Sequence, residues 1–299
     1  MDWQSGGMSD DVEDRRGDSG GGGGFNLGGG CIGVVAFIVL LILSLATGRN
    51  YLGLLFRDAG QPQTQAGPRY AGQDGSGAGN PSASPAEDRS ARLVSFVLDD
   101  AQKTWTKIFA DEGQQYRHAK LVLYRGATYS GCGTAQSQTG PFYCPVDEKV
   151  YIDLDFWDEL RRLGGNSADF AQSYVVAHEL GHHVQKLLGI EGKVQRLMRQ
   201  DPEDRSALSV DLELQADCFA GVWGHSTEQR KIIDSSDVAD ALKAAAAVGD
   251  DHIARTQGRA VSPENFTHGT SAQRQRWFEE GLRDGTIEGC TTFGGRLAP

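Results

Sequence analysis

The sequence predicts one folded domain of the α+β class, mostly helical, over residues 92–299. Hydrophobic residues recur at helical spacing over 166–190 and over 206–223, which is typical of helices that pack on a core. Two apolar runs, KLVLY at 120–124 and KVYIDLDF at 149–156, have the composition of strands and flank a loop. We expect them to pair as a hairpin ahead of the first of these helices.

The composition limits the size of the core and the kind of partner. With 39% hydrophobic residues among 299, the chain can bury one sizeable core. Its formal net charge is −11, and Lys and Arg do not cluster. Because a nucleic-acid partner requires a basic surface, we do not expect one.

The part of the chain before the domain has three segments of different composition. Residues 1–30 combine acidic residues, Ser and Gly with little apolar surface, which predicts a disordered N-terminus. Residues 31–48 carry no charge. Together with the uncharged residues from Phe25 onward they reach roughly 27 to 35 Å as a helix, enough to cross a bilayer, so we predict one transmembrane helix. Residues 57–91 are rich in Gly, Pro, Gln and Ser and predict a flexible linker.

The apolar stretch has two other interpretations. A buried core helix is disfavoured because the run is apolar all round and has Gly-rich flanks. A cleaved signal peptide would use Ser44-Leu45-Ala46 as its small-residue site. It is disfavoured because the long acidic leader differs from a basic n-region.

Four cysteines follow the linker, namely Cys132, Cys144, Cys218 and Cys290. An even number beyond a membrane anchor is typical of an oxidising compartment, so we expect the domain to lie outside the cytoplasm. Four cysteines allow three pairings; the most local one joins Cys132 to Cys144 across a Gly/Ser/Gln-rich turn and leaves Cys218 for Cys290. A zinc ribbon is weakly indicated because no Cys-x-x-Cys occurs.

The segment VVAHELGHHVQ, residues 175–185, places titratable groups inside an apolar helix. Ser167 is a plausible N-cap of that helix, Asp169 lies in its first turn, and Gly189 marks its end. His183 in the same segment points about 100° away from its neighbour, so we expect it in the polar core or behind the ligands.

The spacing of two histidines in this helix predicts a metal site. His178 and His182 are four residues apart, so they share a face with Cβ atoms about 5 to 6 Å apart, and two imidazoles at that separation can bind one zinc ion. Glu179 lies beside them. It would act as general base on a water whose pKa zinc lowers to about 7.

A third ligand is needed, and the second helical stretch supplies a candidate. Glu213 and Asp217 are again four residues apart. Glu213 would provide the carboxylate oxygen, and Asp217 would accept a hydrogen bond from a ligand histidine and so determine its tautomer. Alone, this pair would be more typical of a solvated helix face; its coupling to the first motif favours the metal site.

The two motifs, His-Glu-x-x-His and Glu-x-x-x-Asp, together resemble those of the thermolysin-like gluzincins. Five segments in order, GPFYCP (140–145), YVVAHELGHHVQ (174–185), ELQADCFAGVW (213–223), GDDHI (249–253) and FTHGTSAQR (266–274), resemble the bacterial putative neutral zinc metallopeptidases, a membrane-anchored family. The resemblance spans about 90–294. It implies a zincin-like zinc peptidase with His178, His182 and Glu213 as metal ligands and Glu179 as the base.

Peptide hydrolysis also needs a hydrogen-bond donor for the oxyanion of the tetrahedral intermediate. His268 lies just before a helix that Thr270 or Ser271 could cap. A histidine at a helix entry is usually structural, but the zinc-bearing helices offer no donor, so we select it as the candidate. Tyr129 and Tyr143 on the cysteine loop compete for the role.

The sequence therefore predicts a membrane-anchored zinc-dependent endopeptidase. We expect a single-pass protein of the bacterial cell membrane with an extracytoplasmic domain that holds a peptide or protein substrate along an edge strand. Two alternatives stay open. One is a metal-dependent amidase that acts on a cell-wall peptide or a small molecule; the other is a non-catalytic binding module stabilised by zinc, which would need a fourth ligand.

Overall fold

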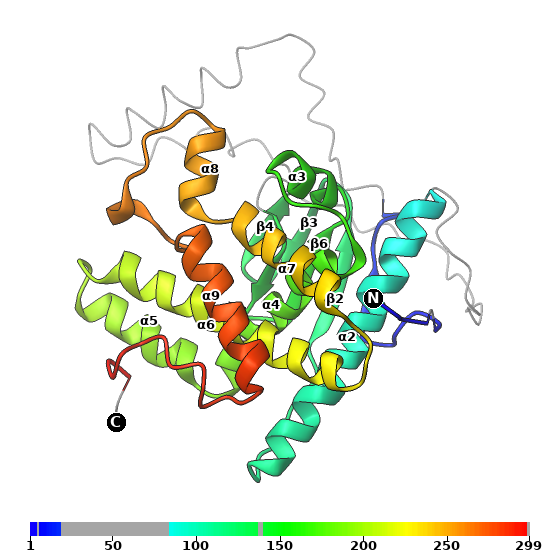
Figure 1. Ribbon diagram of the computed structural model, residues 1–299, viewed down its shortest axis with the longest axis horizontal. Coiled ribbons are helices and arrows are strands. Elements are labelled where there is room, and N and C mark those ends of the chain that lie inside the picture. The colour runs from blue at the N-terminus through cyan, green and yellow to red at the C-terminus, as the bar shows by residue number, and fades with distance from the viewer. Residues whose placement is uncertain (5, 19–83, 137–139, 298–299) are drawn as a thin grey trace, which may run out of the picture. The chain divides into compact units, whose positions relative to one another are not determined.

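The computed structural model describes residues 1–4, 6–18, 84–136 and 140–297, and it confirms the mostly helical α+β class (Figure 1). The strands are β1 (Val12–Asp14), β2 (Lys120–Tyr124), β3 (Ala127–Ser130), β4 (Gly133–Gln136), β5 (Phe142–Cys144) and β6 (Lys149–Asp153). The helices are α2 (Pro85–Asp111), α3 (Phe156–Arg162), α4 (Asp169–Leu187), α5 (Ile190–Gln200), α6 (Arg205–Gln229), α7 (Ser235–Ala247), α8 (Asp250–Thr256), the 3₁₀ helix η3 (Pro263–Asn265) and α9 (Ser271–Asp284).

The main sheet has the strand order β1-β2-β6-β5. The hairpin predicted from the two apolar runs is wrong, because β2 and β6 run parallel, with Lys120 opposite Lys149. The chain between β2 and β6 is long enough to return to the end of the sheet at which β2 begins. It contains the β3–β4 hairpin and strand β5. Within the main sheet, β5 and β6 form an antiparallel hairpin, and Glu148 in the turn between them has a φ of 56°.

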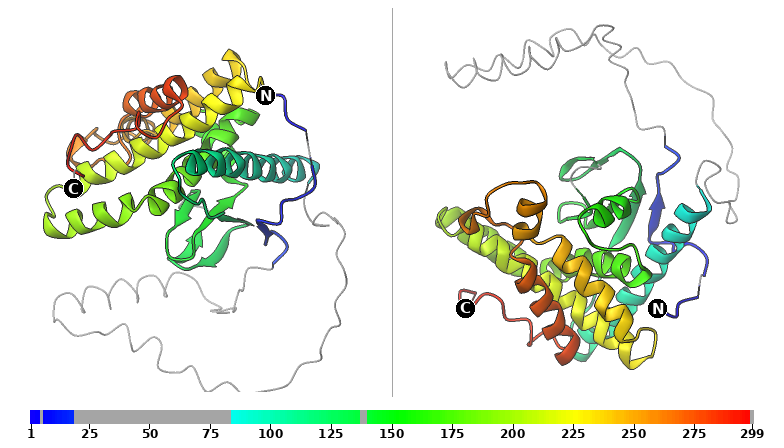
Figure 2. Two further views of the ribbon diagram at one scale, coloured as in Figure 1. Left: turned by 90° about the horizontal axis from the view of Figure 1, so that it is seen from below. Right: turned by 45° about the horizontal axis from the view of Figure 1, so that its top comes forward.

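Helix α4 lies at the centre of the domain. It packs against α2, α6, α7 and the strands β5 and β6, and Figure 2 shows helices surrounding it beside the sheet. Its side chains are buried without interruption from Phe170 to Gly181, as expected for a helix that other elements cover on several sides. The expected Asp169 does lie in the first turn, and Gly189 ends the helix with a φ of 72°. The N-cap, however, is Ala168, whereas Ser167 accepts a hydrogen bond from Arg161.

Residues 1–18 fold onto the domain, in contrast to the disorder that we predicted for residues 1–30. Strand β1 pairs with β2 in parallel, and the segment runs beside α2 (Figure 2). The composition was misleading because the acidic side chains find cations on the domain: Asp11 pairs with Lys120, and Glu13 pairs with Lys149. We call residues 1–18 the N-terminal arm.

The domain begins earlier than the predicted boundary at residue 92. Ser84 caps α2 and exchanges a capping box with Glu87, so residues 85–91 are helical. The predicted transmembrane helix at 31–48 and most of the predicted linker lie outside the described residues. Within the described ranges, no helix is both long and apolar enough to span a membrane.

Both predicted disulfides form. Cys132–Cys144 joins the β3–β4 turn to β5, and Cys218–Cys290 joins α6 to the segment after α9. Each bond therefore ties an irregular segment to an element near the centre of the domain.

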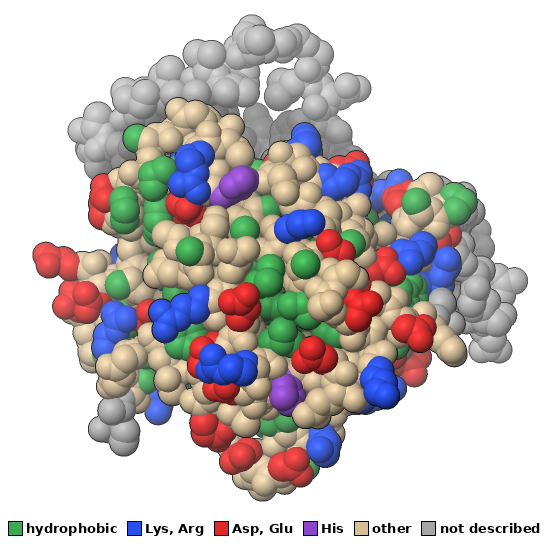
Figure 3. Space-filling model, viewed as in Figure 1, with side chains coloured by type: hydrophobic (Ala, Val, Ile, Leu, Met, Phe, Trp, Pro, Cys, Tyr) green, Lys and Arg blue, Asp and Glu red, His purple; other side chains and the backbone are tan. Residues whose placement is uncertain are grey.

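The face of the molecule in Figure 3 mixes charges of both signs. Basic and acidic side chains are interspersed there, and the described residues of that face form no broad basic area of the kind that a polyanion needs. The predicted lack of a nucleic-acid partner stays a prediction.

We expect Arg16→Met to destabilise the protein more than Arg15→Met. Arg16 is 6% exposed and bonds both oxygens of Asp14 as well as Asp88, so its loss leaves part-buried carboxylates unpaired. The free energy of unfolding should fall by about 1.5 to 3 kcal/mol.

The control pair, Arg15 with Glu13, is more exposed, and its loss should cost about 0 to 1 kcal/mol. Urea unfolding of both variants gives the comparison. Equal stability of the Arg16 variant and the unmodified chain would show that the arm is not docked in solution.

Candidate active site

Three side chains from two helices converge at the end of a cavity. His178 and His182 on α4 have ring centroids 4.9 Å apart, and Glu213 faces them from α6. His178 Nε2 lies 3.2 Å from Glu213 Oε2, and His182 Nε2 lies 3.6 Å from Glu213 Oε1. One ligand atom from each of the three lies within 4.8 Å of the others. The structure thus brings together the three residues that we predicted as metal ligands.

The close approach of α4 to α6 makes this convergence possible. A Cβ atom on Gly181 would lie 2.9 Å from the backbone oxygen of Ala216, a distance that side chains do not tolerate. Because Gly181 has no side chain, the two helix backbones touch, and Glu213, one turn before Ala216, reaches the histidines. The cost of glycine in a helix, about 1 kcal/mol, is offset by this packing.

His178 is held by a charged network behind the ligands. Asp217, which has no exposed surface, accepts from Nδ1 of His178 at 2.8 Å and from the hydroxyl of Tyr174. Arg274 on α9 donates to both oxygens of Asp217, at 2.8 and 2.9 Å. Burial raises the pKa of Asp217, but Arg274 and His178 outweigh it and lower that pKa. Asp217 is therefore an anion that accepts the Nδ1 proton of His178 and leaves Nε2 as the ring nitrogen that faces Glu213.

The electrostatics of the metal-free site follow from the same contacts. Burial opposes protonation of His178, yet Asp217 and Glu213 raise its pKa to about 10. Glu213 is stabilised as a carboxylate, because the two histidines lower its pKa despite burial. Cation and anion already attract each other here, so the ligand atoms are drawn together before any metal binds.

Glu179 has the opposite character. It is 6% exposed and lines the cavity, and within the described part of the chain it makes no hydrogen bond or ion pair. Burial raises the pKa of this carboxyl group, against the effect of the neighbouring histidines. A carboxylate that is destabilised in this way is a stronger base than one in water.

The cavity has a volume of about 530 Å³. The apolar part of its wall comes from Phe142, Phe156, Val175 and Ile253. The polar part includes the three metal-site residues, Glu179 and His268. Strand β5 forms one side, so an edge of the sheet is exposed to the cavity.

His268 lies at the cavity, on the loop before α9, as the sequence suggested. Its Nδ1 lies 3.2 Å from Asp250 Oδ1, and the other oxygen of Asp250 accepts from the backbone nitrogen of His268. The hydrogen bond that the His268 ring donates to Asp250 raises the pKa of His268, although burial opposes this. Thr270 caps α9, as expected for one of the two candidate residues.

The two competing tyrosines are placed differently. Tyr129 is 76% exposed on β3 and does not line the cavity. Tyr143 lines the cavity, but its hydroxyl group bonds to Nδ1 of His183 at 2.9 Å, and Nε2 of His183 bonds to the backbone oxygen of Arg117. Since that nitrogen must donate to a carbonyl, Nδ1 accepts, and the proton of Tyr143 is already used. His183 is a buried polar residue of the core.

Sequence reasoning missed four residues that support the site: Tyr174, Gln185, Asp250 and Arg274. Tyr174 and Gln185 had a usable signal, because they lie on α4 at spacings of four and three from the ligands His178 and His182. Asp250 and Arg274 come from elements distant in the chain. No spacing rule connects them to the histidines.

A mostly helical domain with two helix-borne imidazoles, a carboxylate and an unpaired buried glutamate is of the metal-dependent hydrolase type. The family model described as "Putative neutral zinc metallopeptidase" matches residues 1–293. The chain belongs to this family, and the match includes the N-terminal arm, which lies outside the range of the resemblance seen in the sequence.

Two relatives show how far the similarity extends. The chain is 47% identical over 300 residues to Uncharacterized protein YpfJ of Escherichia coli (strain K12), an alignment that covers 98% of this chain and 99% of that protein. It is 44% identical over 189 residues to Uncharacterized protein Mb2605 of Mycobacterium bovis, covering 60% of this chain and 63% of that protein. No solved structure matches the chain.

Replacing the two acidic residues of α6 separately should distinguish their roles. Glu213→Gln should remove most of the zinc affinity, because an amide oxygen is a poor substitute for a carboxylate on zinc. Asp217→Asn should weaken zinc binding by roughly tenfold to a hundredfold, and excess zinc should restore occupancy.

Metal content after dialysis, measured for both variants side by side, makes the comparison. If Asp217→Asn lost zinc irrecoverably while Glu213→Gln kept it, Asp217 would be the third ligand.

Proposed function

We propose that the protein is a zinc-dependent endopeptidase with its active site in the cavity beside α4. The observation that carries this proposal is the pairing of two features. Two imidazoles and a carboxylate point their lone pairs at one place, and the unpaired carboxyl group of Glu179 lies next to them. The zincin-like fold that we expected is supported by this arrangement on two adjoining helices.

The donor set fits zinc in a catalytic site. Zinc prefers imidazole nitrogen and carboxylate oxygen, and catalytic zinc keeps three protein ligands with one position open. Among the described residues, the cluster contains His178, His182 and Glu213 and no fourth member. The alternative of a binding module stabilised by structural zinc would need a fourth ligand, so it is less well supported.

Zinc bound there would acidify water and polarise the carbonyl oxygen of a substrate. Glu179 accepts a proton from the attacking water, for which its raised pKa suits it, and later delivers that proton to the leaving nitrogen. Asp217, anionic and buried, keeps His178 in the tautomer that presents Nε2. Each residue thus holds or moves a proton at a defined atom.

His268 is suited to stabilise the oxyanion. Nδ1 lies 2.9 Å from the hydroxyl of Thr267 and 3.2 Å from Oδ1 of Asp250, which leaves Nε2 as the nitrogen available to a substrate in the cavity. With Nδ1 donating to a carboxylate, Nε2 carries a proton only in the imidazolium form. The raised pKa of His268 favours that form.

The position of β5 supports a peptide as the substrate. This strand is the edge of the sheet that borders the cavity, and an extended peptide can pair with such an edge through backbone hydrogen bonds alone. The apolar wall offers space for side chains beside the scissile bond. A metal-dependent amidase that acts on cell-wall peptides would use the same residues. Digestion of a peptide library distinguishes the two kinds of substrate.

Digestion of an unbiased peptide library by the full chain, with and without a chelator, tests the function. We expect internal cleavage that stops when zinc is removed and returns when it is added. Release of only terminal groups or of non-peptide amides would favour the amidase.

The cellular location is a further part of the proposal. We propose that the domain works outside the cytoplasm of a bacterial cell, which the two disulfides support. Attachment to the membrane through residues 31–48 stays a prediction.

Glu179→Gln should retain zinc and fold but lose hydrolysis by about a hundredfold to ten-thousandfold. The amide keeps the size of the side chain and cannot accept the proton. Turnover and zinc content are measured on the same preparation, and a variant that turned over at the normal rate would remove Glu179 from the mechanism.

Asp250→Asn should shift the alkaline limb of the activity profile to lower pH. Activity requires protonated His268, so it falls as the pH rises through the pKa of that group. The hydrogen bond that His268 donates to Asp250 is the main cause that raises this pKa. In His268→Ala, we expect turnover to fall about a hundredfold to a thousandfold with little loss of thermal stability.

A profile of Asp250→Asn that matched the unmodified chain would separate His268 from catalysis. So would a His268→Ala variant that unfolded easily yet worked normally when folded.

A further inference from the structure

The two ligand histidines are held by different kinds of partner. Behind His178 stands the charged pair of Asp217 and Arg274. Behind His182 stands a neutral side chain, Gln185, whose Oε1 lies 2.9 Å from Nδ1 of that histidine. Gln185 is one turn further along α4 and is fully buried, with 1% of its surface exposed.

The orientation of the Gln185 amide is determined by its other contacts. Its Nε2 donates to the backbone oxygen of Leu212 at 2.7 Å and to Oε1 of Gln215 at 3.1 Å. Because both partners are acceptors, Nε2 must face them, and Oε1 must face His182. Nδ1 of His182 is therefore the protonated nitrogen, and its Nε2 lone pair is left for the metal.

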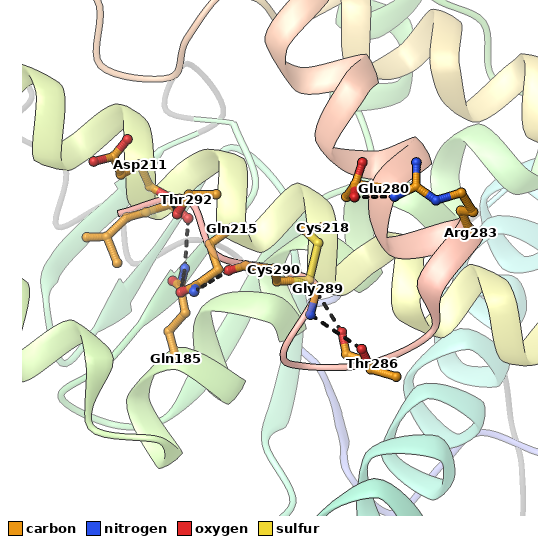
Figure 4. The surroundings of a disulfide bond; sticks show 11 residues. Gln185, Asp211, Gln215, Cys218, Glu280, Arg283, Thr286, Gly289, Cys290 and Thr292 are labelled. Atoms are coloured by element: carbon orange, nitrogen blue, oxygen red, sulfur yellow. Dashed lines mark hydrogen bonds and ion pairs between the residues drawn. A yellow bond between two sulfur atoms is a disulfide. The ribbon is translucent and has the colours of Figure 1, made fainter. Parts of the chain in front are cut away.

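The chain of amides continues to the second disulfide. Gln215 is buried on α6, and its Nε2 donates to the backbone oxygen of Cys290 at 2.9 Å. Cys290 is bonded to Cys218, one turn after Gln215 on the same helix. Figure 4 shows Gln185 and Gln215 between α4 and the C-terminal segment, with Cys290 at the end of the row.

We propose that Gln185 and Gln215 are positioning residues for the zinc ligand His182, and that the Cys218–Cys290 disulfide completes this support by holding the last acceptor in place. The inference rests on the proposed zinc site. It assigns a function to a disulfide that would otherwise only stabilise the fold, and it makes the segment after α9 part of the metal centre. Further contacts of the segment, from Thr292 and Arg296 to Asp211, keep it beside α6.

The test is the zinc affinity of the full chain, measured by competition with a chromophoric chelator. Gln185→Met keeps the volume of the side chain and removes its amide, so affinity should fall about tenfold to a hundredfold. Gln215→Met should act in the same direction and more weakly, because it leaves Gln185 bonded to Leu212. Cys218→Ala combined with Cys290→Ala should lower affinity by a few-fold.

The chain contains one matched control for the glutamine variants and one for the double cysteine variant. Gln172 is buried on the same helix and donates to a backbone oxygen, that of Ser167, but does not contact a ligand. Gln172→Met should therefore lower thermal stability and leave zinc affinity unchanged. Removal of the other disulfide, Cys132–Cys144, should likewise leave zinc affinity unchanged, since none of its contacts reaches a metal ligand.

Nitrogen chemical shifts of His182 give a readout that a purely structural role would not move. In the unmodified zinc-bound chain, Nδ1 of His182 should carry the proton. In Gln185→Met, the His182 ring should no longer be protonated at Nδ1 alone once zinc is removed.

Unchanged zinc affinity in both Gln185→Met and Gln215→Met would overturn the inference, as would an equal loss in Gln172→Met. If Gln185→Met fails to fold, the zinc affinities of Gln215→Met and of the double cysteine variant test the inference. An unmodified chain that bound no zinc would overturn the proposed function itself.

A separate observation concerns the side of the membrane on which the N-terminal arm lies. The arm contacts several parts of the domain: Trp3 donates to Asp169 of α4 at 2.7 Å, Ser9 bonds Ser95 and Asp99 of α2, and β1 pairs with β2. The residues of the arm and of the domain belong to one compact unit. Polar contacts so specific need both partners in one compartment.

We infer that the arm and the domain lie on the same side of the membrane. A helix that crosses a bilayer once places the residues before it and after it on opposite sides. A docked arm is therefore inconsistent with the single-pass arrangement that we predicted, in which the arm and the domain would lie on opposite sides.

Labelling of the full chain in spheroplasts with a membrane-impermeant maleimide tests this inference. Gly7→Cys in the arm, where a Cβ meets nothing within 4 Å, and Lys103→Cys on the exposed face of α2 are each placed in a Cys31→Ser background. Both should react to the same extent before permeabilisation.

Reaction of Lys103→Cys alone before permeabilisation, with Gly7→Cys reacting only afterwards, would overturn the inference. If both reacted only after permeabilisation, the shared side would stand, and the extracytoplasmic location would be wrong.

Discussion

The buried carboxylate of Asp217 is the point on which the site depends. It has no exposed surface and bonds to His178 and Tyr174 on α4 and to Arg274 on α9, while its own backbone belongs to α6. Burial of such a charge costs several kcal/mol unless partners surround it, and here the partners come from two other helices, α4 and α9. The helices that form the site can therefore pack in only one register without leaving this charge unpaired.

The same requirement explains two of the glycines where α6 and α9 meet. A Cβ atom on Gly281 would lie 1.9 Å from the backbone oxygen of Cys218, and one on Gly221 would lie 2.1 Å from that of Phe278. These glycines let α9 lie against α6 closely enough for Arg274 to reach Asp217. The close packing of α9 on α6 and the pairing of Arg274 with Asp217 thus depend on one another.

Local chemistry in the sequence was sufficient to predict which residues converge at the candidate metal site, both disulfides, the C-terminal end of α4 and the cap of α9. In each case the signal lay within a few residues of the feature, as in the four-residue spacing of His178 and His182. The parallel pairing of β2 with β6 and the bond from Arg274 to Asp217 join segments far apart in the chain. Hydrophobic periodicity carries no information on such pairings. It shows which face of a helix or strand is buried, but not which other element covers that face.

The N-terminal arm shows the limit of composition as a guide. Its acidic residues have the low hydropathy of a disordered segment, yet Asp11, Glu13 and Asp14 all form ion pairs in the fold. A mean hydropathy over the arm cannot represent these ion pairs, since the stabilising cations belong to β2, β6 and the arm itself. Charge complementarity between distant segments has to be seen in the structure.

Docking of the arm also affects how a substrate can bind. A four-stranded sheet has two edges, and unpaired edges invite strand addition. In the order β1-β2-β6-β5, the arm covers β2, and the edge strand β1 itself carries two acidic residues. The edge at β5 remains, and it borders the cavity and is tied to the β3–β4 turn by Cys132–Cys144. An extended peptide that pairs with this sheet is thereby directed to the edge that lies beside Glu179 and the metal-site residues.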